Sequence, residues 1–194
     1  SRAKREQGDV DGALQLARRA LALSHDDEDA KSAVFFALVD RIKRAREADE
    51  CDLVEALMRE ARPYEGALRG QPWPREEIIG GALAHAGEVA FKTSEWKKAG
   101  GLLTRAATHL PSDATIRTNL ARVDANQALA HAKAGACDQA RPLAHRAGLG
   151  DPTVHASMVS ALEHCAHVVA ERAAASADWA GAAPRQSVLI VDDS

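Results

Sequence analysis

Residues 94–99 have the sequence SEWKKA, and a motif of the same kind recurs along the chain. It consists of a polar pair typical of a turn, a large or apolar residue, two further residues and an alanine. The five copies are GDVDGA (8–13), CDLVEA (51–56), SEWKKA (94–99), GACDQA (135–140) and ADWAGA (177–182). The third residues of the copies are spaced by 43, 43, 41 and 42 positions, and the alanines keep the same spacings. Two positions that stay in step through five copies indicate an internal repeat of about 42 residues.

Each copy is predicted to begin a helix. After SEWKKA, the apolar residues Leu102, Leu103 and Ala106 follow at helical spacing. Longer helical segments with clear start signals lie between the copies: Ser112-Asp113 precedes 115–134, and Asp151-Pro152 precedes 153–175. Each unit is therefore predicted to be a long helix, a tight turn and a shorter helix. The abundance of alanine and the 4% share of aromatic residues also favour an all-α fold built from thin helical layers.

Residues 83–113, LAHAGEVAFKTSEWKKAGGLLTRAATHLPSD, resemble a nearly complete tetratricopeptide repeat. Gly87, Trp96, Ala99, Ala106 and Pro111 stand at signature places of that family. The stretches EQGDVDGALQLARRALALSHDD (6–27) and KAGACDQARPLAHRAGLGDP (133–152) resemble parts of the same repeat. The family repeat has about 34 residues, so the first helix of each unit would be about two turns longer here.

This resemblance implies a right-handed superhelical solenoid of antiparallel helix pairs over residues 1–183, followed by an extended tail at 184–194. It also implies a non-catalytic scaffold or adaptor that binds a protein or peptide partner in its concave groove. The long first helix of each unit would line that groove.

Polar side chains that lie beside the buried stripe of such a helix would face the partner. In the helix 114–134, the stripe is Ile116, Leu120 and Val123. One polar line beside it consists of Thr115, Asn119, Arg122, Asn126 and Lys133, and the analogous line of the preceding unit is His85, Glu88 and Lys92. Asn can both donate to and accept from a peptide backbone, while Arg and Lys can hold a carboxylate. The alternative is that these lines are plain solvated faces.

The segment 63–74 interrupts the helical rhythm with prolines and glycines. It is predicted to be a long loop between repeats. Trp73 either packs against the helices or belongs to a protrusion that binds the partner.

Net charge excludes a strong global field for nucleic acid or for an anionic membrane, because 25 basic residues face 28 acidic ones. Two basic runs, Arg2-Lys4-Arg5 and Arg41-Lys43-Arg44-Arg46, are followed by acidic residues. We expect them to be solvated helix faces, with a patch for an acidic partner as the alternative. No stretch approaches about 18 consecutive apolar residues, so no membrane span is predicted.

Three cysteines, Cys51, Cys137 and Cys165, lie far apart and without a CxxC pair. This pattern predicts reduced thiols and a cytoplasmic protein. The chain begins within a helical pattern, so we expect it to be a piece of a longer protein.

Catalysis, metal binding and cofactors are not predicted. His164, His167 and Glu171 share one helix face, but a helical stripe without a fourth convergent ligand is common by accident. The glycine pairs 80–81 and 100–101 lie inside helical patterns and are predicted to permit close helix packing rather than to hold a phosphate.

The run 188–194, VLIVDDS, differs from the rest of the chain because it is β-branched and ends in paired acids. It resembles the first strand and acidic pair of a bacterial receiver domain. A peptide that docks on another chain and an incidental end of the chain are the alternatives. The receiver-like sequence supports a second function, a sensory or regulatory module of a larger signalling protein.

Overall fold

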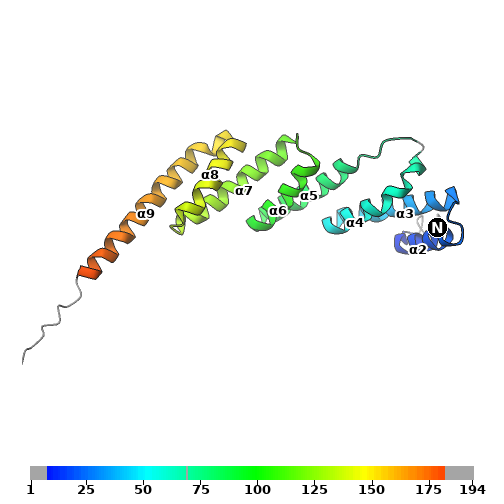
Figure 1. Ribbon diagram of the computed structural model, residues 1–194, viewed down its shortest axis with the longest axis horizontal. Coiled ribbons are helices and arrows are strands. Elements are labelled where there is room, and N and C mark those ends of the chain that lie inside the picture. Colours follow the sequence, from blue (N-terminus) through cyan, green and yellow to red (C-terminus); the bar gives the residue numbers. More distant parts are fainter. Residues whose placement is uncertain (1–7, 69, 182–194) are drawn as a thin grey trace, which may run out of the picture. The chain divides into compact units, whose positions relative to one another are not determined.

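The computed structural model describes residues 8–68 and 70–181, and the fold over these residues is all-α. Labels follow Figure 1. The helices are α2 (Val10–Leu23), α3 (Glu28–Glu47), α4 (Cys51–Ala61), α5 (Arg75–Lys92), α6 (Trp96–His109), α7 (Ala114–Lys133), α8 (Cys137–Gly150) and α9 (His155–Gly181), with the 3₁₀ segments η1 (Arg62–Leu68) and η2 (Pro152–Val154). Consecutive helices pack as antiparallel neighbours, as α5 with α6 and α8 with α9 (Figure 1). The predicted sequence of long helix, tight turn and shorter helix is confirmed, while the right-handed superhelix stays a prediction.

The chain divides into two compact units, and the boundary lies between Val123 and Asp124. The first holds α2 to α6 and the beginning of α7, and the second holds the rest of α7 with α8 and α9. Each is described by itself below.

The turn between the two helices of a pair has three residues: 48–50, 93–95 and 134–136. Its middle residue has a left-handed backbone, with φ of 56° at Asp49, 62° at Ser94 and 76° at Gly135. In each turn the next N–H bonds back five residues, as from Glu95 to the Ala90 carbonyl at 2.9 Å. This is the Schellman arrangement, which satisfies carbonyls at the end of a helix.

Aspartates begin two of the long helical segments as predicted. Asp113 accepts hydrogen bonds from the N–H groups of Thr115 (2.8 Å) and Ile116 (3.1 Å). Asp151 accepts one from Thr153 at 3.0 Å, and η2 rather than an α-helix follows it. Both caps use carboxylate oxygens to satisfy N–H groups that have no acceptor within the helix.

The repeat register predicted for the second copy is wrong by two residues. The short helices begin at Val10, Cys51, Trp96 and Cys137, which are spaced by 41, 45 and 41 positions. The fourth residues of these helices, Ala13, Val54, Ala99 and Ala140, are all fully buried. Ala56, which the sequence pattern aligned with them, is exposed. The left-handed residue of this turn is Asp49, so the turn precedes the Cys51-Asp52 pair that was taken for it.

The fifth copy is wrong as well, because α9 continues through Ala177 and Asp178 to Gly181 without a turn. This stretch of α9 is rich in alanine, which favours helix propagation. The predicted tail 184–194, with its receiver-like sequence, lies outside the described residues.

The core of the first unit contains large side chains, among them Phe35, Leu38 and Leu83, each at most 1% exposed. Trp73 packs edge-to-face on Phe35, with ring centroids 4.9 Å apart and planes inclined by 70°. Trp73 is half-buried and thus follows the packing alternative. The prediction of a long loop over 63–74 is wrong in part, because η1 (Arg62–Leu68) covers its first half. Its role in binding stays a prediction.

The second unit has a core of small side chains. Its described buried apolar residues are alanines together with Met158 and Cys165. Ala128, Ala144 and Ala147 surround Met158, and Ala132 and Ala140 surround Cys165.

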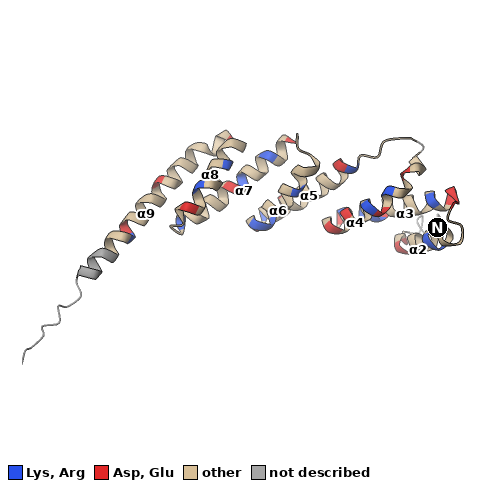
Figure 2. Ribbon diagram, viewed as in Figure 1, with Lys and Arg blue, Asp and Glu red and all other residues tan. Residues whose placement is uncertain are grey.

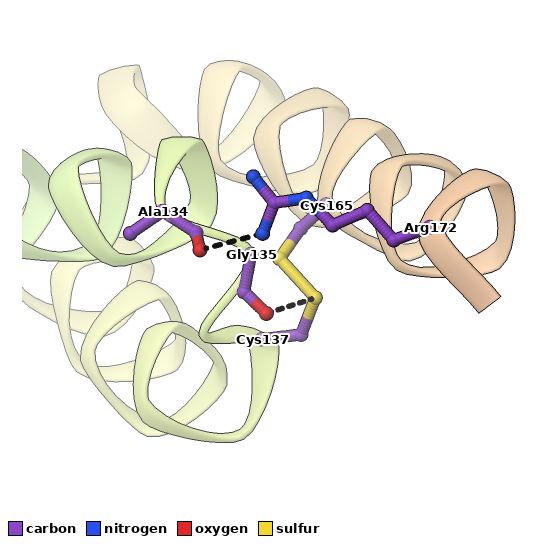
Figure 3. Close-up of a disulfide and its surroundings, with 5 residues drawn as sticks. All are labelled: Ala134, Gly135, Cys137, Cys165 and Arg172. Carbon is purple, nitrogen blue, oxygen red and sulfur yellow. Dashed lines mark hydrogen bonds between the residues drawn. A yellow bond between two sulfur atoms is a disulfide. The ribbon is translucent and has the colours of Figure 1, made fainter. Parts of the chain in front are cut away.

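Cys137 and Cys165 form a disulfide, so the prediction of reduced thiols is wrong for this pair (Figure 3). The two residues are 28 positions apart, and only the packing of α8 on α9 brings their Cα atoms within 5.8 Å. Sequence spacing alone carries no sign of that proximity. The cytoplasmic location loses the support of the cysteine pattern and stays a prediction.

Gly87 permits the close approach of α5 and α6. A Cβ atom added at this position would lie 2.7 Å from Cγ of the fully buried Leu103. The same test at Gly80 gives 2.6 Å to Leu110 Cγ, whereas Gly81 and Gly101 face open space. Close packing is thus confirmed for Gly80 and does not explain Gly81 or Gly101.

Gly87→Ala should lower the free energy of unfolding of the first unit by about 1–2 kcal/mol, because overpacking exceeds the helix-propensity gain of about 1 kcal/mol. Gly81→Ala, in the same helix, should instead stabilise the unit by about 0.5–1 kcal/mol. Urea denaturation followed by circular dichroism measures both. Equal shifts in the two variants would contradict the α5–α6 contact.

Candidate partner-binding groove

Helix α5 supplies the middle of the candidate site. Its predicted line consists of His85, Glu88 and Lys92, and all three lie on α5 within the first unit. The structure divides the line between two neighbouring cavities. Glu88 and Lys92 face one that α5 shares with the start of α7, and His85 faces one that α5 shares with α3.

The cavity between α5 and α7 has a volume of about 400 Å³. Its lining consists of Glu88, Phe91, Lys92, Leu103, Thr115, Asn119 and Arg122. Five of these residues belong to the predicted polar lines, so the structure brings together two lines that the sequence assigned to separate helices.

A hydrogen bond connects the two helices across this cavity. Asn119 Nδ2 donates to Glu88 Oε1 at 3.0 Å, and both side chains are half-buried. The apolar part of the lining is well packed, since Leu103 is fully buried and Phe91 packs edge-to-face on Trp96 with ring centroids 5.0 Å apart. The cavity therefore joins an apolar floor to a rim of amide, hydroxyl and charged groups.

The cavity between α3 and α5 also has a volume of about 400 Å³. Lys43, Arg46 and Glu47 of α3 line it opposite His85. His85 Nε2 lies 3.7 Å from Asp49 Oδ1. The sequence offered the basic run of α3 as an alternative patch for an acidic partner, but it did not predict that these residues lie opposite His85.

The basic residues of α3 lie on two different faces of the helix. Arg41 pairs with Asp11 at 3.0 Å, and Arg44 donates to the Gly8 carbonyl, so both face α2. Lys43 and Arg46 line the cavity, and neither forms an ion pair with any residue that the structure describes. Helical periodicity was the available signal, because residues 41 and 44 share one face and residues 43 and 46 another.

We name the two cavities together the α3–α5–α7 groove, defined by Lys43, Arg46, Glu47 and His85 on one side and by Glu88, Lys92, Thr115, Asn119 and Arg122 on the other. Acidic and basic residues are interspersed along the helices that form it (Figure 2). Four cations and two carboxylates contribute, which gives the groove a modest positive balance.

Three predicted binding residues do not line the groove. Asn126 and Lys133 lie further along α7, in the second unit. Trp73 lies against Phe35, as described above. Their binding roles stay predictions.

A larger cavity of about 540 Å³ lies at the beginning of α4, next to α5 and α6. The charged side chains there are largely paired with each other: Arg105 donates to Asp52 at 2.8 Å and to Glu55 at 2.7 Å. Cys51 also lines this cavity, but burial raises the pKa of its thiol and keeps it protonated. This cavity therefore offers fewer unpaired groups to a partner than the groove does.

Histidines and acidic residues are scattered over the described residues, 8–68 and 70–181. Within those ranges no three His, Cys, Asp or Glu residues gather as a metal site would require. His167 Nδ1 lies 3.7 Å from Glu171 Oε1 on the exposed face of α9. None of the described helices combines the length and the apolar character that crossing a bilayer demands.

Comparisons with known proteins leave the family open. No protein-family model matches the chain, and no curated protein matches its sequence. A solved structure titled "Crystal structure of BtubC (BKLC) from P. vanneervenii" aligns over 100% of both chains with 15% sequence identity and a TM-score of 0.25. A superposition this loose carries no argument about fold or function.

Proposed function

We propose that this chain is a non-catalytic module of the tetratricopeptide type that binds an extended segment of a partner protein in the α3–α5–α7 groove. The observation that carries the proposal is the shared cavity of Glu88, Lys92, Thr115, Asn119 and Arg122. These residues come from two polar lines that periodicity puts beside the buried stripes of successive long helices, and the tetratricopeptide resemblance implies that such lines face the concave surface.

The packing of the signature residues supports the family assignment. Ala99 and Ala106 are fully buried, Trp96 packs on Phe91, and Gly87 lies against Leu103. Small residues at these places let the two helices of a pair approach closely. The tetratricopeptide pattern requires the same arrangement.

The lining favours a polar, extended peptide. A side-chain amide can both donate a hydrogen bond to a peptide backbone and accept one from it. The hydrogen bond from Asn119 to Glu88 holds the Asn119 side chain in place. Lys43, Arg46, Lys92 and Arg122 can hold carboxylates of the partner. Affinity would come from several modest contacts along rigid helices.

Arg122→Ala should weaken partner binding by about 1–2 kcal/mol, which corresponds to a roughly five- to thirtyfold higher Kd, because a charge-assisted contact is lost at a solvent-exposed position. The partner is first isolated by pull-down from native lysate and identified by mass spectrometry. Isothermal titration calorimetry then gives Kd at low and high salt. Salt should weaken wild-type binding more than binding by the variant.

Arg117→Ala is the matched control, since Arg117 is an exposed arginine of the same helix that does not line the groove. It should leave Kd unchanged. If both arginine variants bind the partner as the wild type does, the groove is not the binding site.

A further inference from the structure

The disulfide of the second unit joins the beginning of one helix to the middle of the next. Cys137 is the first residue of α8, and Cys165 lies within α9 (Figure 3). Cys165 is fully buried, whereas Cys137 is half-buried. A thiolate from solution would therefore attack the disulfide at the sulfur of Cys137.

The C-terminal part of α9 has few other contacts with the rest of its unit. From residue 166 to residue 175, every side chain is exposed except the half-buried Val168. Arg172 supplies one polar contact, a 3.2 Å hydrogen bond from Nη1 to the carbonyl oxygen of Ala134 (Figure 3). The disulfide is thus the strongest attachment of this part of α9.

The surrounding core cannot replace that attachment. The buried neighbours of Cys165 are Ala132 and Ala140, and alanine side chains bury little apolar area. Without the bond, the helices would be held together at this point by contacts with these alanines and with the partly buried Ala161 and Leu162.

We propose that Cys137 and Cys165 form a thiol–disulfide exchange site, and that reduction of this disulfide releases the C-terminal part of α9. The co-reactant is a small disulfide such as glutathione disulfide. This inference concerns the second unit and does not depend on the partner-binding groove.

Oxidation takes place in two balanced steps. The Cys137 thiolate, formed by loss of a proton to solvent, attacks one sulfur of glutathione disulfide; a mixed disulfide forms and one glutathione thiolate leaves. The Cys165 thiolate then attacks the Cys137 sulfur, and the second glutathione thiolate leaves. Two cysteine thiols are oxidised while one glutathione disulfide is reduced to two glutathiones. Position favours Cys137 as the first nucleophile, because a helix N-terminus stabilises a thiolate.

Cys51 provides an internal comparison. It is buried in the first unit, its thiol donates to the Ala82 carbonyl at 3.4 Å, and burial raises its pKa. We expect it to stay a free thiol under conditions in which the pair exchanges.

The exchange is tested on the full chain equilibrated in buffers of different glutathione to glutathione disulfide ratios. The samples are quenched in acid, labelled with iodoacetamide and analysed as peptides by mass spectrometry. We expect a linked Cys137–Cys165 peptide that is replaced by two labelled peptides as reduced glutathione increases. A linked peptide that persists at every ratio would show a permanent structural bond, and its absence at every ratio would show that the pair does not form; either result overturns the proposal.

The release of α9 is tested by hydrogen exchange of the oxidised and the reduced wild-type chain. Amides of residues 166–175 should exchange at least tenfold faster after reduction, while those of α5 and α6 should not change. Cys137→Ser should behave as the reduced chain does, and Cys51→Ser should respond to reduction as the wild type does. Equal protection of residues 166–175 in both redox states would overturn the proposed release.

Discussion

Replacing Phe35 by alanine should lower the free energy of unfolding of the first unit by about 3–5 kcal/mol. Phe35 is 1% exposed and makes edge-to-face contacts with both Trp73 and Phe36. Its removal would leave a cavity beneath Trp73 and would weaken the packing of Trp73 on the core. Urea denaturation followed by far-UV circular dichroism measures the loss.

Phe36→Ala is the matched control, because the adjacent ring is 39% exposed. It removes the same number of atoms but should cost only about 1 kcal/mol, since less apolar area leaves the core. Comparable losses in the two variants would mean that Phe35 is not the centre of this cluster.

Ala99→Leu should destabilise the first unit by about 3 kcal/mol, at the upper end of the usual cost of overpacking. Ala99 is the fully buried fourth residue of α6, and three additional carbon atoms would have to enter a filled site. Chemical denaturation measures the change.

Ala56→Leu distinguishes the two repeat registers. The sequence pattern aligned Ala56 with Ala99, whereas the structure places Val54 at the equivalent buried position. Since Ala56 is exposed, its replacement should change stability by less than about 0.5 kcal/mol. A large loss at Ala56 would restore the register that the spacing of 43 residues predicted.

Local signals in the sequence predicted the helices and most of their boundaries. Asp113 and Asp151 cap the segments that they were expected to cap, and Gly135 ends α7 in the left-handed conformation. Ser94 and Asp49 adopt the same conformation although neither is a glycine. Residues other than glycine adopt positive φ only rarely, so the sequence gives no clear sign of where they do so. This explains why the turn at Asp49 was misplaced.

Contacts between distant segments were beyond the reach of the sequence. The polar lines on α5 and α7 follow from helical periodicity, but the participation of Lys43 and Arg46 requires knowing that α3 lies next to α5. The Cys137–Cys165 bond requires knowing which turn of α9 faces the beginning of α8. Both facts depend on tertiary packing, and the spacing of residues along the chain does not indicate them.

The connections within helix pairs are uniform in length, whereas those between pairs vary. The three described turns within pairs have three residues each, whereas the described segments between pairs range from the short 24–27 and 110–113 to the long 62–74. All irregularity of the repeat in the first unit thus falls on the links between pairs and on the helix ends beside them. For protein engineering, the links are the natural places to splice in a spacer or to add and remove whole hairpins, while the three-residue turns set the alignment of each hairpin and are best left untouched.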